Sequence, residues 1–263
     1  MTLAQSADAR ADREAREREL ILDDYNLDQF LEVAAGFGTG RYGYVVTPNV
    51  DHIIQFHESR DFRTLYANAA YVLLDSRFAA HLLRLVHGIR VGVCTGSDLT
   101  AGLFQRVMQP ADRIVVIGGS PAQANQLRER FGLSDLRHHN PPMGFIDDAA
   151  AVEHCLDFIE KASPFRFCVM AVGTPRQEVL ALRLAQRGIA RGLVLCTGAA
   201  LNFLTGAEQR APAWMQCAGL EWLYRLLRSP RRLAGRYLVR GPRFFAYLGR
   251  TRPTLRYGRP ITG

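Results

Sequence analysis

The sequence lacks the usual marks of a secreted, disulfide-bonded or membrane-spanning protein. Its five cysteines are scattered, no two form a C-x-x-C pair, and most lie in apolar runs, where free cysteine behaves as a small hydrophobe. Neither a disulfide framework nor a zinc site is therefore expected. Residues 1–20 alternate arginine with acidic residues and contain no apolar segment of the signal-peptide kind. No run reaches the ~18 apolar residues of a membrane span, and we expect a cytoplasmic protein.

Acidic residues almost disappear from the last part of the chain. After Thr205 there are twelve arginines but only two acids, Glu208 and Glu221, which gives this part a charge near +10 and leaves about −2 for the rest. A basic segment attached to a nearly neutral core suggests an anionic surface as partner, either a membrane or a nucleic acid. The alternative is a solvated helical face without a partner.

The composition favours one globular domain with an appendage. At 263 residues and 48% hydrophobic content, the chain can build a full core. We expect a flexible segment over 1–20, a core over 21–208 and a basic amphipathic appendage over 209–263. Leucine and tryptophan recur at helical spacing in the appendage, with arginine on the other faces. Such a helix can lie in a membrane interface or simply dock on the core.

Apolar runs alternate with helix-length segments through the predicted core. This order indicates βαβ units and an α/β, Rossmann-like fold, with a mostly parallel sheet and helices on both faces. Helices are expected between the strands, including 99–108 after the third strand. The expected strands are 44–46, 71–74, 91–94, 113–117, 136–139, 167–172 and 192–196.

Small and polar residues follow these strands. In parallel sheets, ligands bind beyond the carboxyl ends of the strands, so these residues define a candidate ligand-binding rim. They are residues 47–49, 75–76, 95–98, 118–119, 173–174 and 197–198.

Several motifs occur along the chain in a characteristic order. They are Thr47-Pro-Asn49, Asp75 at a strand end, Thr95-Gly-Ser-Asp-Leu99, Ile117-Gly-Gly119, Met143-Gly-Phe145, Gly173-Thr-Pro-Arg-Gln-Glu178, residues 198–206, Arg210-Ala-Pro212 and Gly219-Leu-Glu-Trp-Leu-Tyr-Arg225. With these motifs, residues from about 25 to about 245 resemble the WecG/TagA/CpsF glycosyltransferases of bacterial cell-surface polysaccharide synthesis.

The resemblance implies a reaction and a location. Members of the family transfer a sugar, with inversion, from a nucleotide-diphosphate sugar to a polyprenyl-diphosphate-linked sugar. This places the protein peripherally on the inner face of the cell membrane, with no nucleic acid partner. UDP-N-acetylmannosamine and UDP-glucose are donors used within the family. Ser76 and Asn202 stand where many members have Gly and Asp, which favours the exopolysaccharide branch. The sequence leaves the oligomeric state open, a homo-oligomer included.

The resemblance also assigns roles to residues on the rim. An inverting transfer needs a base for the acceptor hydroxyl, and Asp75 matches the base proposed for the family; its alternative role is a helix cap. Thr47 and Asn49 match pocket residues, or else serve the turn itself. Asp98 either binds a sugar hydroxyl or caps the helix that we expect to begin at Leu99.

Further residues on the rim are expected to contact the donor. Gln177 matches a donor-side residue, although Thr174 and Gln177 also have the spacing of a capping box with Pro175 as first helical residue. Three glycines allow backbone to approach a nucleotide, or are ordinary turn residues. They are Gly118, Gly119 and Gly198, and Asn202 lies on the same rim.

The leaving diphosphate needs positive charge, and no Asp-x-Asp motif supplies a metal. Arginine can bind phosphate in a bidentate way, so the arginines of the appendage motifs are candidates, with simple surface charge as the alternative: Arg210, Arg225, Arg232 and Arg236. We therefore expect no metal and no cofactor. The sequence also allows two other functions. One is a nucleotide-binding oxidoreductase or epimerase, for which a G-x-G-x-x-G motif is expected after a strand. The other is a non-catalytic membrane or nucleic-acid binder that uses the basic appendage and does not need Asp75.

Overall fold

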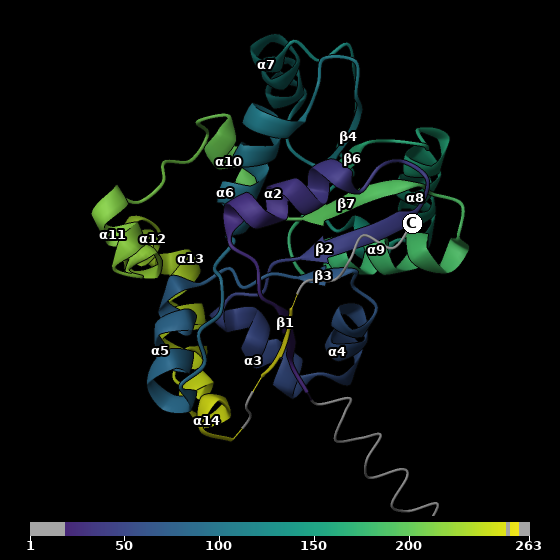
Figure 1. Ribbon diagram of the computed structural model, residues 1–263. Coiled ribbons are helices and arrows are strands. Elements are labelled where there is room, and N and C mark those ends of the chain that lie inside the picture. The colour runs from purple at the N-terminus through teal and green to yellow at the C-terminus, as the bar shows by residue number, and fades with distance from the viewer. Residues whose placement is uncertain (1–18, 251–252, 258–263) are drawn as a thin grey trace, which may run out of the picture.

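The computed structural model describes residues 19–250 and 253–257, and they form a parallel α/β sheet with helices on both faces (Figure 1). The six strands of the main sheet run in the order β3-β2-β7-β6-β4-β5, all parallel. This confirms the α/β, Rossmann-like prediction. The strands are β2 (Tyr42–Val46), β3 (Tyr71–Val72), β4 (Arg113–Ile117), β5 (Asp135–His139), β6 (Phe167–Met170) and β7 (Gly192–Cys196).

The sheet divides the interior into two hydrophobic cores. In β4, Val115 and Ile117 face one core, whereas Ile114 and Val116 face the other. Successive side chains of a strand point to opposite faces, and a strand buried on both faces is apolar at every position. This is why the central strands read as unbroken apolar runs in the sequence.

Each core is closed by its own set of helices. One face is covered by α2 (Leu27–Gly36), α6 (Gly96–Gly102), α7 (Pro121–Phe131) and α10 (Ala200–Leu204). The other core takes side chains from α3 (Val50–Glu58), α4 (Arg60–Ala67), α5 (Arg77–His87), α8 (Ala149–Lys161) and α9 (Arg176–Arg187). A short 3₁₀ turn, Phe145–Asp147, precedes α8.

Several predicted elements differ from the structure. The strands expected over 71–74 and 167–172 end at Val72 and Met170. The strand expected over 91–94 is absent from the described chain, because this segment makes a bond from Cys94 N–H to the Leu74 carbonyl (3.0 Å) without continuing a ladder. The helix expected over 99–108 starts earlier, at Gly96, because the Thr95 hydroxyl caps it. Its last turn, Leu103–Val107, has π-helical bonding.

The C-terminal part leaves the core and then returns to it. After α10 come α11 (Ala213–Cys217), α12 (Glu221–Arg228), α13 (Pro230–Ala234), the π-helical turn η3 (Gly235–Arg240) and α14 (Arg243–Arg250). Buried Phe244 and Leu248 of α14 join one of the two cores. The appendage is therefore packed on the core through its last helix. The division at residue 208 stays a prediction, and residues 1–18 lie outside the described chain.

A second, two-stranded sheet joins the two ends of the described chain. The strand β8 (Thr254–Arg256) pairs in parallel with β1 (Ile21–Asp23), and neither strand was expected from the sequence. Asp23 is buried and accepts hydrogen bonds from the Val72 N–H and from Arg256 Nη2, both at 2.7 Å. One carboxylate thus connects β1, β3 and β8.

Candidate active site

The predicted base, Asp75, lies just past the end of β3 and is not used as a helix cap. Its own N–H donates to the Pro48 carbonyl (2.8 Å), which fixes the backbone beside the Thr47-Pro-Asn49 turn. The cap of α5 is Ser76, whose hydroxyl accepts from the Ala79 N–H (3.1 Å). The Asp75 carboxylate is therefore not needed to cap α5 and is available for another role.

The surroundings of Asp75 raise the pKa of its carboxyl group. The residue retains partial exposure, as contact with a substrate requires, but protein encloses its carboxylate and burial raises the pKa to about 7. A hydrogen bond from the Gly96 N–H lowers the pKa, Glu221 raises it and Arg225 lowers it. A carboxylate with a pKa near neutrality suits a general base, because it is both ionised and basic at working pH.

Asp98 is held in an ion-pair network and does not cap its helix. Thr95 is the cap, and its hydroxyl also donates to Asp98 Oδ2 (2.8 Å). Arg210 of the appendage donates to Asp98 Oδ1, and Arg77 lies 3.5 Å from Oδ2. Burial alone would raise the pKa of Asp98, but the bonds from Arg210 and Thr95 outweigh it and hold the pKa below its usual value. The network connects α6, α5 and the appendage.

The Thr47-Pro-Asn49 turn is bound by the appendage on its open side. Asn49 caps α3, accepting from the Asp51 N–H (3.1 Å), and the same Oδ1 accepts from Arg236 Nη2 (3.1 Å). Arg236 Nε lies 3.3 Å from Asp51 Oδ2. Buried Thr47 donates to the Cys196 carbonyl (3.3 Å) at the end of β7. Asn49 thus serves the turn as a helix cap and also contacts an arginine of the appendage, whereas its role as a pocket residue stays a prediction.

A buried histidine supports this turn, and the sequence analysis missed it. His52 has its pKa lowered to about 3, first by burial and then by Arg236, so the ring is neutral. Its Nδ1 lies 3.2 Å from the Tyr66 hydroxyl, and the ring bonds the backbone of Thr47. Its position on an otherwise apolar helix face gave no sign of this role.

Nitrogen donors of the appendage are left without acceptors beside the site. Among the described residues, Nε of Arg210 and Nε1 of Trp222 are buried and have no hydrogen-bond partner. Arg236 Nε and Arg210 Nη2 also make no hydrogen bond there, but they lie 3.3 Å from Asp51 Oδ2 and 3.8 Å from Glu221 Oε2 as ion pairs. Buried donors are normally satisfied. The guanidinium of Arg225 lies over the Phe203 ring (5.7 Å) and acts on Asp75. The side chain of Arg232 lies outside the described residues.

The capping box that was the alternative role of Thr174 and Gln177 does not form at α9. Pro175 precedes the helix and no side chain caps it. Instead, the Thr174 hydroxyl donates to Glu178 Oε1 (3.0 Å), and Gln177 Nε2 donates to the same oxygen (2.8 Å). Gln177 Oε1 accepts the Gly198 N–H (3.0 Å). The predicted contact of Gln177 with the donor stays a prediction, and Glu178 is a further residue that the sequence analysis did not single out.

The remaining predicted residues lie farther along the rim. Gly118 and Gly119 follow β4 with φ of 89° and 75°, and a Cβ on Gly119 would lie 2.8 Å from the Leu201 side chain. Asn202 of α10 accepts from Gln123 Nε2 (3.1 Å). From Asp75 the rim thus passes through Thr47, Gly198 and Thr174 to Gly118, in the order of the strands that carry them.

A comparison with known protein families matches residues 19–257 to the glycosyl transferase WecG/TagA/CpsF family. The chain belongs to this family. It is a glycosyltransferase of cell-surface polysaccharide synthesis, which uses a nucleotide-sugar donor and a sugar acceptor. This identity takes precedence over the oxidoreductase, epimerase and non-catalytic alternatives. The match includes β8, at the far end of the appendage.

Two further features of this WecG/TagA/CpsF-family chain bear on metals and membranes. In the described ranges, no three His, Cys, Asp or Glu side chains are grouped so that they could hold a metal ion. No helix among the same residues has the length and apolarity to cross a bilayer. The absence of a metal requirement stays a prediction.

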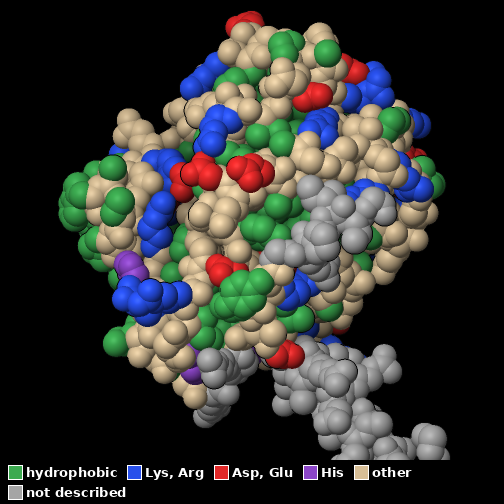
Figure 2. All heavy atoms as spheres, in the orientation of Figure 1, with side chains coloured by type: hydrophobic (Ala, Val, Ile, Leu, Met, Phe, Trp, Pro, Cys, Tyr) green, Lys and Arg blue, Asp and Glu red, His purple; other side chains and the backbone are tan. Residues whose placement is uncertain are grey.

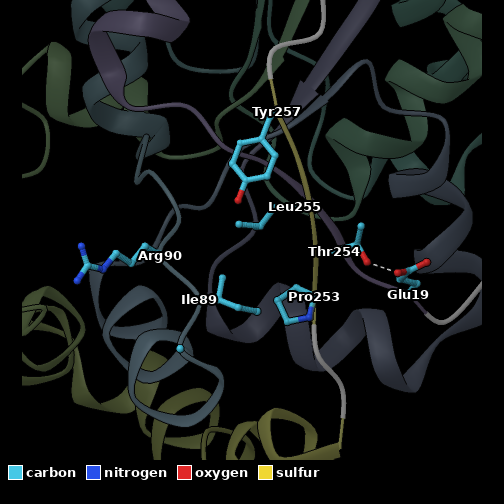
Figure 3. A pocket seen from close by; sticks show the side chains of 8 residues that line it. Glu19, Ile89, Arg90, Pro253, Thr254, Leu255 and Tyr257 are labelled. Carbon is cyan, nitrogen blue, oxygen red and sulfur yellow. Dashed lines mark hydrogen bonds between the residues drawn. The ribbon is translucent and has the colours of Figure 1, made fainter.

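A surface cavity of about 710 Å³ lies away from the predicted site residues of the glycosyltransferase (Figure 3). It is bounded by β8 and by the segment that follows α5, including Arg90 and Tyr257. None of the residues predicted for the reaction lines it. The rim of the main sheet therefore remains the candidate active site.

Proposed function

We propose that this glycosyltransferase moves a sugar from a UDP-sugar to a polyprenyl-diphosphate-linked sugar, with inversion and with Asp75 as the base. The observation that carries the proposal is Asp75 itself, a carboxylate at a strand end with a pKa of about 7, within the electrostatic influence of Arg225 of the appendage. The reaction takes place at the inner face of the cell membrane.

In the proposed step, the proton of the acceptor hydroxyl passes to the Asp75 carboxylate. The acceptor oxygen forms a bond to the anomeric carbon while the bond from that carbon to the phosphate oxygen breaks. The bonding electrons stay on the diphosphate, which leaves as the nucleoside diphosphate. Attack from the side opposite the leaving group accounts for inversion.

The arginines of the appendage stabilise the leaving diphosphate. Arg210 carries a buried Nε–H without a hydrogen-bond partner, and phosphate oxygens are strong acceptors for such a group. Arg236 supplies a second guanidinium, which is ion-paired with Asp51. Arg225 acts directly on Asp75. Arginine in these positions takes the place of a metal ion, and we propose that the transfer needs none.

The appendage is also suited to an anionic membrane surface. Large hydrophobic side chains are exposed in it between arginines: Trp214, Leu227, Leu238, Val239 and Phe245. Figure 2 shows hydrophobic side chains gathered on the outer lobe of the molecule where Figure 1 places α11 and α12, with basic side chains beside them. Apolar side chains flanked by arginine bind an interface through burial and charge together. The lipid-linked acceptor would be met there.

The donor sugar follows less directly from the structure. Ser76 caps α5 beside the base, and Asn202 bonds Gln123 on the other side of the rim. Many family members carry Gly and Asp at these positions, and we propose an exopolysaccharide-type donor, UDP-glucose before UDP-N-acetylmannosamine.

The test is transfer from a panel of radiolabelled nucleotide sugars to synthetic polyprenyl-diphosphate sugars, with EDTA and anionic vesicles present. Wild type is expected to transfer from one UDP-sugar, and Asp75→Asn to lose about 10²- to 10⁴-fold in kcat. Asp61→Asn, which changes an exposed carboxylate in the first turn of α4, serves as the matched control. Full activity of Asp75→Asn, or no transfer from any donor, would contradict the proposal.

A further inference from the structure

The buried carboxylate of Glu178 has no role in the proposed transfer. It lies in the first turn of α9 with no exposed surface, and no arginine or lysine is among its hydrogen-bond partners. An unpaired buried carboxylate is costly to keep in a fold. We infer that Glu178 is a positioning residue, which fixes the orientation of the Gln177 amide and thereby the Gly198 turn of the active site.

The hydrogen-bonding chemistry of the Glu178 carboxylate, the Gln177 amide and the Gly198 N–H allows one orientation of the amide. The oxygens of a carboxylate accept hydrogen bonds, whereas a backbone N–H can only donate. The Gln177 amide lies between Glu178 Oε1 (2.8 Å from Nε2) and the Gly198 N–H (3.0 Å from Oε1). Turning the amide over would set its NH₂ group against the Gly198 N–H, so that two donors would face each other. The carboxylate therefore favours the same orientation of Gln177 as the Gly198 N–H does, and it is the nearer acceptor of the NH₂ group, since Thr174 Oγ1 lies 3.4 Å from Nε2.

The arrangement persists when Glu178 binds a proton. Burial raises the pKa of Glu178 to about 7, but Oε2 has no partner among the described residues and can take the proton. Oε1 then remains an acceptor for Gln177 Nε2 and for the Thr174 hydroxyl. A glutamine at 178 can offer the same acceptor oxygen, whereas a leucine cannot.

The Gly198 turn needs such a support. Gly198 has φ of 58°, in the left-handed region, and it separates the end of β7 from α10. Gln177 is 1% exposed, so it acts on the turn from inside the protein. The proximity of the turn to the donor nucleotide rests on the proposed function. The support of the turn by Glu178 through Gln177 is independent of it.

The first test reads the turn without any enzyme assay. In protein labelled with ¹⁵N-glycine, the Gly198 amide proton is expected to exchange with solvent at least about tenfold faster in Glu178→Leu than in wild type. Glu178→Gln is expected to stay within about threefold of wild type, because it keeps the acceptor. The exposed Glu129→Leu is the matched control and should change nothing. Equal protection in Glu178→Leu and wild type would overturn the inference.

The wild type alone gives a second test, should Glu178→Leu fail to fold. The Nε2 protons of Gln177 are expected to show nuclear Overhauser contacts to the Thr174 side chain and none to the Gly198 amide proton. The reverse pattern would overturn the inference whatever the variants do.

Steady-state kinetics then test whether the Gly198 turn contributes to donor binding. Glu178→Leu and Gln177→Leu are each expected to raise the donor KM about tenfold with little change in kcat. The double variant should be no worse than either single one, because both break the same chain of contacts. Additive effects would overturn the chain of contacts. If Gly198 loses protection while the donor KM is unchanged, the positioning role stands and the donor site must be placed elsewhere.

Discussion

The pKa of Asp75 makes a prediction about how the rate depends on pH. Burial raises this pKa to about 7, and only the ionised form can accept the proton of the acceptor hydroxyl. The ionised fraction then increases from about one tenth at pH 6 to about nine tenths at pH 8, so kcat/KM should rise about tenfold over this interval and level off above it. The assay is the initial rate of sugar transfer at subsaturating acceptor.

Neighbouring charges identify the group that titrates. Glu221 raises the pKa of Asp75, so Glu221→Gln should move the midpoint of the profile to lower pH. Arg225 lowers the pKa, so Arg225→Gln should move the midpoint to higher pH, whatever it does to the rate.

A control is needed because the pKa of Glu178 is also raised to about 7. Glu178→Gln should leave the midpoint in place, since Glu178 is not among the groups that shift Asp75. A rate that is flat between pH 6 and 8, or a midpoint that moves in Glu178→Gln and not in Glu221→Gln, would refute the assignment of Asp75 as the base.

Two further predictions concern stability. The folded-state pKa of Glu178 lies above its ordinary value, so burial of this side chain costs little when it is protonated and about 3 kcal/mol when it is ionised. Glu178→Gln should therefore raise the free energy of unfolding at pH 8 by about that much more than at pH 5. Equal effects of the substitution in urea melts at both pH values would contradict this prediction. Arg256→Met should lower the free energy of unfolding by about 3–5 kcal/mol, because it leaves the buried Asp23 carboxylate without its cation. The exposed pair Arg243–Glu58 is the control, and Arg243→Met should lower the free energy of unfolding by less than about 1 kcal/mol. Similar losses of stability in both variants would show that the buried pair stabilises the fold no more than the exposed one.

The order of strands and helices could be predicted because it depends on local patterns. Strands buried on both faces are apolar at every position, and β4 and β7 were found almost to the residue for this reason. Ser120 followed by Pro121 is a local signal of the same kind, and α7 begins there with Ser120 as its cap. The prediction failed where the same local pattern fits both a strand and an extended segment outside the sheet. The apolar segment 91–94 has the composition of a strand but lacks a continuous ladder.

The ligand-binding rim followed from the same pattern, because parallel strands bring their carboxyl ends to one edge. Family motifs then singled out Asp75 and Asn49 on that rim. The sequence by itself therefore determined the fold class, the edge of the sheet where the polar strand ends gather and the basic character of the appendage. All three depend on residues close together in the chain or on simple composition.

Only the tertiary structure decided which distant groups meet. Arg210 pairs with Asp98, Arg236 reaches Asn49, and β8 returns to β1. None of these contacts has a sequence signal, since each joins residues more than 100 positions apart. The raised pKa values of Asp75 and Glu178 were also decided there, because the pKa of a carboxylate depends on the burial and charge around it. A sequence specifies the carboxylate, whereas folding creates the environment that sets its proton affinity.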